Sequence, residues 1–167
     1  MWRRLIQTMS WQRWRAQRIA RRNFQAQHLE RIAAQISQSE AGHSGEVVVA
    51  IEVISPLHEQ DSRMRAREVF GRLGVWDTPQ NSGVLLYIAL DRRRIELIAD
   101  RGISASAQSW EKVCTQLQSR FARQDYLPAV IDAVAEIEQI LRQTAPALSA
   151  RDTNANHLQD APVVLSP

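Results

Sequence analysis

Hydrophobic residues follow two different spacings along this chain, one typical of strands and one typical of helices. Two runs of strand length with almost no polar interruption lie at 46–54 and 83–90, and their β-branched and aliphatic residues predict strands covered on both faces. A third run at 94–99 follows a short polar turn, so the second and third runs predict a β-hairpin. The first two runs are far enough apart for a helical crossover, which predicts a mixed sheet.

Four further segments place apolar residues three and four positions apart, the spacing of an amphipathic helix. Predicted helices therefore cover 24–37, 61–73, 110–121 and 127–143. The second of these begins at an N-cap, Asp61 or Ser62. Its inward face is predicted to consist of Ala66, Val69, Phe70 and Leu73, and its solvent face of Arg63, Arg65, Arg67 and Arg72. The chain is therefore expected to adopt an α/β fold.

The composition suits one domain with short extensions. Of 167 residues, 44% are hydrophobic and 23% charged, enough for a sizeable core. The pattern divides into a helical arm at 1–23, an α/β domain at 24–144, and a tail at 145–167 that has three prolines and is expected to be disordered. No apolar run exceeds strand length, so no membrane-spanning helix is predicted. The single cysteine, Cys114, excludes an internal disulfide and is predicted to be a buried hydrophobe.

The net charge of +3 hides an asymmetry between the arm and the body. Residues 1–28 contain seven arginines and no acid, so the rest of the chain is net acidic. Tryptophan and arginine together suit a membrane interface, where indole lies at headgroup depth and guanidinium meets anionic lipid. The alternatives are a helix that packs its tryptophans on the domain or on a second copy, and a nucleic-acid contact, which the acidic body disfavours. The arm residues expected to contact a membrane or a membrane-associated protein are Trp2, Arg3, Arg4, Trp11, Arg13, Trp14 and Arg15.

Polar residues gather where the predicted strands begin or end. The candidate catalytic residues are His43 and Glu46 before and in the first strand, Asp77 before the second, and Asp100 and Arg101 after the third. Asp77 and Asp100 could hold Ca²⁺ or Mg²⁺, which prefer oxygen ligands, with Arg101 stabilising developing negative charge. The structural alternative is that these aspartates shape turns and that His43 is solvated or caps its loop.

Several motifs occur in the order found in a known family: SEAGHSGE at 39–46, VWDT at 75–78, GVLLYIAL at 83–90 and ADRGI at 99–103. With the order of strands and helices over 24–144, they resemble the TPM domain, also called the TPM phosphatase domain, in its short bacterial branch without a secretory signal or membrane anchor. The positions carried over by motif are Glu40, His43, Gly45, Glu46, Trp76, Asp77, Thr78, Asp100, Arg101 and Gly102.

The resemblance implies a compact α/β sandwich in which helices pack on the faces of a mixed sheet. Plant thylakoid members are linked to photosystem II repair and to acid phosphatase activity, and secreted bacterial members to divalent-metal binding. This chain departs from the longer members, because it lacks their tyrosine/valine-asparagine-aspartate start and has QNSG at 80–83 in place of an acidic DNG motif. One metal carboxylate is therefore missing.

Two classes of function follow. The first is an accessory or interaction module, cytoplasmic and peripheral at the inner face of the membrane, whose arm docks on the membrane or on a membrane protein. The second is a divalent-metal-dependent phosphatase-like hydrolase built on Asp77 and Asp100. The basic, tryptophan-rich arm and the small number of acidic residues available as metal ligands favour the interaction module. The oligomeric state stays open.

Overall fold

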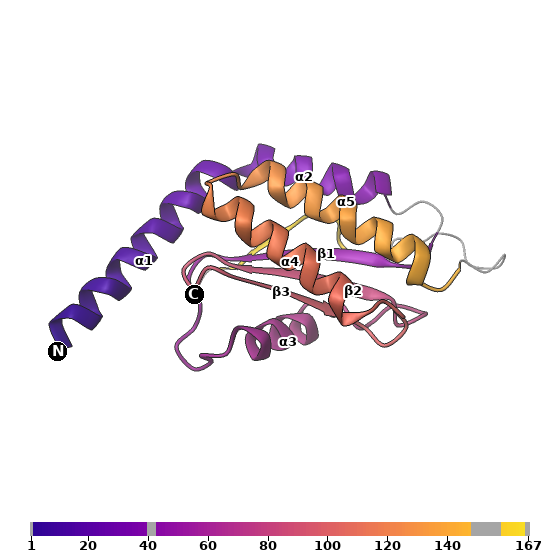
Figure 1. Cartoon of the computed structure of the whole chain (residues 1–167), viewed down its shortest axis with the longest axis horizontal. Helices are drawn as coiled ribbons and strands as arrows, with labels where there is room; N and C mark the ends of the chain where they lie inside the picture. The colour runs from indigo at the N-terminus through magenta and orange to yellow at the C-terminus, as the bar shows by residue number, and fades with distance from the viewer. Residues whose placement is uncertain (1, 40–42, 148–157, 166–167) are drawn as a thin grey trace.

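The computed structural model describes residues 2–39, 43–147 and 158–165. The helices are α1 Trp2–Asn23, α2 Ala26–Ser39, α3 Ser62–Arg72, α4 Ala107–Ala122 and α5 Leu127–Thr144. The strands are β1 Glu46–Glu52, β2 Gly83–Ala89, β3 Arg94–Ala99 and β4 Val163–Leu165. The expected α/β fold is confirmed (Figure 1).

The four strands form one mixed sheet in the order β3-β2-β1-β4. Strands β1 and β2 run parallel, with Glu46 opposite Gly83, and α3 makes the crossover between them. Strands β2 and β3 pair antiparallel as the predicted hairpin. Every residue of β1 and β2 is buried, which is why their sequences lack the alternation of a half-exposed strand.

Helices cover both faces of the sheet, as Figure 1 shows: α2, α4 and α5 lie on one side and α3 on the other. Because side chains alternate along a strand, Val47, Val49 and Ile51 join the larger core beneath α2, α4 and α5. Val48 and Ala50 point to the opposite side and join a smaller core beneath α3. The sandwich that the resemblance implied is therefore present.

Helix α3 begins as predicted, at an Asp61 N-cap. The Asp61 carboxylate accepts the backbone N–H groups of Arg63 at 2.7 Å and Met64 at 3.0 Å. These two hydrogen bonds hold the pKa of Asp61 below its usual value, because they stabilise the charged form. At the other end of the crossover, a Cβ on Gly83 would lie 1.9 Å from the carbonyl oxygen of Val75, so β2 can begin here only with glycine.

Helix α1 extends away from the body at its N-terminal end, while its C-terminal half is part of the fold (Figure 1). Ala16 is completely buried in the larger core, and Ile19 and Ala20 pack against it. The arm is therefore anchored in the domain well before residue 24. No helix in the described ranges is both long and apolar enough to cross a membrane.

The tail at 145–167 was expected to be disordered. This is wrong for residues 158–165, which the structure describes and which include strand β4. Strand β4 adds to the outer edge of β1, with Ile51 opposite Val164, and the N–H of Val53 donates to the carbonyl of Leu165 at 3.1 Å. Leu165 is buried in the smaller core. Three residues are too few for a period to show in the sequence, and β4 gains its stability from pairing and burial instead. Residues 148–157 lie outside the described residues.

We expect the substitution Leu165→Ala to lower the free energy of unfolding by about 2–3 kcal/mol, because it removes buried methyl groups and leaves space behind. Urea unfolding of the full chain measures this. The matched control is Val164→Ala, since Val164 is 39% exposed and should cost well under 1 kcal/mol. Equal effects of the two substitutions would show that β4 does not hold Leu165 in the core.

Candidate functional site

The predicted strand-end residues lie at the edge of the sheet where β1 and β2 begin and β3 ends. The register places Glu46 beside Gly83, and the N–H of Asp100 donates to the carbonyl of Gly83 at 2.9 Å. This is the amino end of both parallel strands. Ligands in α/β proteins collect at the opposite, carboxyl end.

The two predicted metal ligands are held differently in this edge. Asp77 is exposed in the turn after α3, and its backbone N–H donates to the carbonyl of Gly74 at 2.8 Å. Asp100 uses Oδ1 to accept the N–H of Arg101 at 2.7 Å, while its Oδ2 is buried without a hydrogen-bond partner within the described residues. Across the described ranges, no group of three or more His, Cys, Asp or Glu side chains could hold a metal ion. A calcium or magnesium site on this pair stays a prediction.

His43 and Glu46 both make buried contacts. His43 is 3% exposed, and its Nδ1 accepts the N–H of Gly45 at 3.1 Å, which places the proton on Nε2. That N–H faces Glu138 Oε2 at 2.9 Å. The imidazole is therefore enclosed between α5 and the loop before β1. The expectation of a solvated histidine is wrong, whereas its hydrogen bond to Gly45 does cap the loop, as the alternative expected. Glu46 accepts the N–H of Leu158 at 2.6 Å and so ties the returning tail to β1.

The remaining motif positions at this edge shape its loops. Arg101 is exposed and donates from Nη2 to Asn81 Oδ1 at 3.1 Å. A Cβ on Gly102 would lie 2.2 Å from the carbonyl of Gln80, so only glycine allows the two loops to pack this closely. Thr78 is buried and accepts the N–H of Ser82 at 2.8 Å, whereas Trp76 is exposed. Glu40 lies outside the described residues.

A buried ionic cluster that the sequence analysis did not identify joins α3 to the sheet. Arg65 Nε lies 3.2 Å from each carboxylate oxygen of Glu52, and its Nη2 lies 2.6 Å from Oε1. The hydroxyl of Tyr87 also donates to Glu52. All three side chains are buried, so the prediction that Arg65 faces water is wrong. An acid in an otherwise apolar strand was the signal that could have found this cluster, since a buried carboxylate needs a partner.

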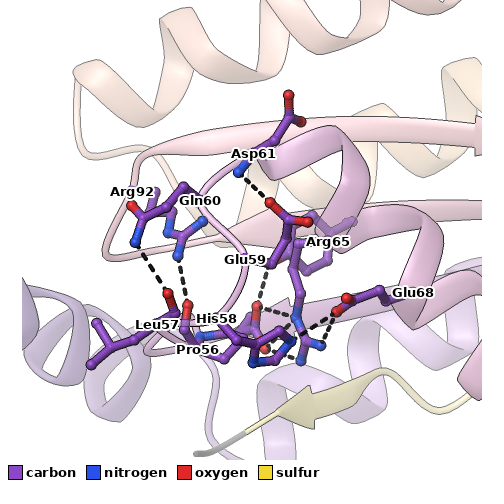
Figure 2. Close-up of polar contacts among 11 residues, drawn as sticks. Pro56, Leu57, His58, Glu59, Gln60, Asp61, Arg65, Glu68 and Arg92 are labelled. Atoms are coloured by element: carbon purple, nitrogen blue, oxygen red, sulfur yellow. Dashed lines mark hydrogen bonds and ion pairs between the residues drawn. The ribbon is translucent and has the colours of Figure 1, made fainter.

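Arg65 also binds Glu68 on the surface of α3, which extends the cluster to the solvent. Figure 2 shows its guanidinium beside Glu68, with an Nη1 to Oε2 distance of 2.8 Å, and His58 next to the same carboxylate. Arg65 holds the pKa of Glu68 below its usual value. Burial and the neighbouring Glu52 raise the pKa of Tyr87, so the phenol stays protonated. The cluster is saturated with internal partners, which marks it as a structural anchor.

One face of α1 carries the exposed tryptophans and two arginines of the basic arm. Trp11 and Trp14 are 56% and 55% exposed, and the guanidinium carbons of Arg15 and Arg18 lie 5.9 Å and 5.5 Å from their ring centroids. The spacing of three and four residues places all four on one face of the helix. The alternative that these two tryptophans pack on the domain is therefore not what the structure shows. The side chains of Trp2, Arg3 and Arg4 lie outside the described part.

On this same face, two adjoining cavities lie between α1 and the α4–α5 junction of the body. The inner cavity, of about 280 Å³, lies at the carboxyl end of β2 between α1, the β2–β3 turn, α4 and the start of α5. The outer cavity, of about 720 Å³, opens along α1 and includes Trp11 and Trp14. Both are lined by Arg15, Ile19, Ala122 and Tyr126, so we treat them together as the α1 groove.

The lining of the α1 groove is strongly one-sided in charge. It contains no acidic residue and five arginines: Arg15, Arg18, Arg22, Arg93 and Arg94. None of the five makes a hydrogen bond or ion pair to a carboxylate within the described ranges. Arg94 interacts electrostatically with Glu96, and the other four have no carboxylate partner in the described part of the chain. Such guanidinium groups, two of them beside exposed indoles, attract anions that also offer an apolar part. The groove was not predicted, because its walls come from segments far apart in the chain.

Cys114 is half-buried and packs against the larger core, so the expected burial is only partial. Burial raises the pKa of its thiol to about 11. From the ordinary value of 9.0, this lowers the thiolate fraction near pH 8 by roughly a hundredfold relative to the unfolded chain. We expect a thiol reagent such as DTNB to label the native protein at least tenfold more slowly than protein unfolded in guanidinium. Equal labelling rates would contradict a protected thiol.

Comparisons with known proteins agree with this architecture. Residues 22–140 match the family model of the TPM domain. The NMR structure of the BA42 protein from the psychrophilic bacterium Bizionia argentinensis has 23% sequence identity and a TM-score of 0.72, with coverage of 84% of this chain and 94% of that one. The NMR structure of the N-terminal domain of a P. gingivalis protein has 17% identity and a TM-score of 0.59, with coverage of 73% and 78%. No curated protein matches the chain.

Proposed function

This chain belongs to the TPM domain family, and we propose that it is an accessory protein whose helix α1 binds the anionic surface of a membrane. The domain would then be held peripherally, with the body of the α/β sandwich outside the lipid. A membrane-associated protein could be engaged once the chain is at that surface. The family membership supports the fold, and the proposal itself depends on α1.

The observation that carries the proposal is the pair of exposed tryptophans. In a folded protein of this size, large aromatic side chains are mostly buried, yet Trp11 and Trp14 each leave more than half of their surface open to solvent. They share one helix face, and the N-terminal part of α1 extends away from the body (Figure 1). Indole is favoured at the headgroup level of a bilayer because its ring is apolar and its N–H is polar.

Electrostatics act in the same direction. Arg15, Arg18 and Arg22 lie on or beside the tryptophan face, and residues 1–28 contain no acid that would neutralise them. Each arginine near an anionic bilayer contributes about 1 kcal/mol at moderate salt. Three such residues together with partial burial of two indoles would exceed the binding of an ordinary surface helix.

Co-sedimentation with vesicles tests the proposal. We expect the full chain to pellet with vesicles of phosphatidylcholine and phosphatidylglycerol, to remain in solution with phosphatidylcholine alone, and to be released as salt is raised. Binding of the full chain that is equally strong to neutral vesicles, or no binding to anionic ones, would contradict an electrostatic membrane contact.

A further inference from the structure

The inner cavity of the α1 groove combines two kinds of surface that are usually kept apart. Its floor is apolar and buried, formed by Ile88, Leu90, Ile95 and Tyr126, each less than 10% exposed. Its opening carries the exposed turn residue Arg93 and the partly exposed Arg15. A site of this kind has one region that excludes water and one that attracts negative charge.

Neither a purely apolar nor a purely ionic ligand would use both regions. Inorganic phosphate would satisfy the arginines but leave the apolar floor in contact with water. An uncharged hydrocarbon would cover the floor but leave the arginines without a counter-ion. The volume of about 280 Å³ lies just below the usual range for small-molecule pockets, so it suits a single hydrocarbon chain rather than a two-chain lipid.

We propose that the inner cavity binds one amphipathic anion, a hydrocarbon chain ending in a phosphate or carboxylate, with its chain against Ile88 and Ile95 and its head at the arginines of the opening. The inference rests on the proposed function only for the source of such a ligand, since a bilayer in contact with α1 would supply it. A soluble fatty acid or alkyl phosphate has the same chemistry.

Strand direction supports this position. The inner cavity lies at the carboxyl end of β2, against Ala89 and Leu90, where ligands of α/β proteins usually bind. Helix α1 forms one wall through Ile19, and the neighbouring Ala16 is completely buried, so that wall is anchored in the core. The helix that carries the exposed tryptophans therefore also encloses the cavity.

The test uses the full chain in the absence of vesicles. The probe is dodecyl phosphate below its critical micelle concentration, and its binding is measured by isothermal titration calorimetry. We expect saturable one-to-one binding of dodecyl phosphate, and at least tenfold weaker binding of inorganic phosphate and of uncharged dodecyl maltoside. The dissociation constant of dodecanoate should lie within tenfold of that of dodecyl phosphate, because guanidinium groups donate hydrogen bonds to a carboxylate as well as to a phosphate. Inorganic phosphate binding as tightly as dodecyl phosphate would overturn the proposal.

Two substitutions at exposed positions of α4 distinguish binding in the inner cavity from non-specific binding elsewhere on the protein, and neither changes a core residue. Gln118→Trp places a bulky side chain in the lining of the inner cavity and should weaken dodecyl phosphate binding at least tenfold. Ser119→Trp is the matched control, because Ser119 is an exposed neighbour on α4 that lines neither part of the groove, and it should bind like the wild type. Arg93→Ala should weaken dodecyl phosphate binding and leave dodecyl maltoside binding unchanged.

The two proposals fail in different ways. If the chain binds dodecyl phosphate more tightly than inorganic phosphate and dodecyl maltoside but does not pellet with anionic vesicles, the proposed ligand site is supported and the membrane proposal is wrong. If the chain pellets with anionic vesicles but Gln118→Trp binds dodecyl phosphate as the wild type does, the cavity proposal is wrong.

Discussion

Replacing Arg65 by alanine is expected to lower the free energy of unfolding by about 3–5 kcal/mol, because it leaves the Glu52 carboxylate buried without its cation. For a chain of this length, that corresponds to a fall in Tm of roughly 6–20 °C. Tyr87 would still donate one hydrogen bond to Glu52, which is too little to compensate a charge that is 2% exposed. Thermal and urea unfolding of the full chain measure the change.

Arg67→Ala is the matched control, since Arg67 lies two residues further along α3 and is exposed. It should change stability by less than about 0.5 kcal/mol. The double substitution Glu52→Gln with Arg65→Met should be less destabilising than the sum of its two single substitutions, because it removes both charges together. Similar losses for Arg65→Ala and Arg67→Ala would contradict a buried ionic anchor.

Replacing Trp11 and Trp14 together by alanine should weaken binding to anionic vesicles at least tenfold while leaving the unfolding temperature nearly unchanged. Both side chains are more than half exposed, so the folded domain loses little from their removal. Burying a large apolar side chain contributes about 1.5–3 kcal/mol, and half of that for each indole already exceeds a factor of ten for the pair. Vesicle titration followed by co-sedimentation gives the ratio.

The control for this pair is Trp76→Ala. Trp76 is 55% exposed, as Trp14 is, but it lies in the turn after α3, which packs on the opposite face of the sheet from α2, α4 and α5. Its removal should leave vesicle binding unchanged. An equal loss from Trp76→Ala would mean that tryptophan content, and not the position on α1, determines the interaction.

Most of the fold was predictable because its strands and helices are strongly patterned. The runs that became β1 and β2 are fully buried, and their β-branched and aliphatic composition indicated this directly. The N-cap at Asp61 was predictable for a similar reason, since one side chain and two backbone N–H groups determine it locally. Strand β4 could not be found in this way, because a three-residue strand depends on the edge that it joins.

Arg65 shows where residue-type patterns fail. Its charge suggested the solvent face, but it lies four residues before Val69 and so on the edge of the inward face of α3. From there its long side chain reaches Glu52, a contact that depends on the packing of α3 over the sheet. The same limit applies to the strand-end residues: local sequence placed them at the beginnings and ends of strands, but only the structure shows that His43 faces Glu138 on α5.

The candidate groove was invisible in the sequence for a physical reason. Its basic and apolar walls come from α1, the β2–β3 turn and the α4–α5 junction, which tertiary packing alone brings together. The arm itself was noticed because its arginines and tryptophans are contiguous in the chain. Local composition therefore identified the membrane-binding candidate, and tertiary structure identified the cavity beside it.

Quenching of tryptophan fluorescence by brominated lipid tests most directly whether α1 lies in the membrane interface. The full chain is mixed with anionic vesicles whose acyl chains carry bromine, and compared with a variant in which Trp2, Trp11 and Trp14 are all phenylalanine. We predict strong quenching of the wild type and much weaker quenching of the variant, because the exposed indoles of α1 enter the lipid while Trp76 stays outside. Equal quenching of the two proteins, or no quenching of wild-type chain that has pelleted with the vesicles, would contradict the account.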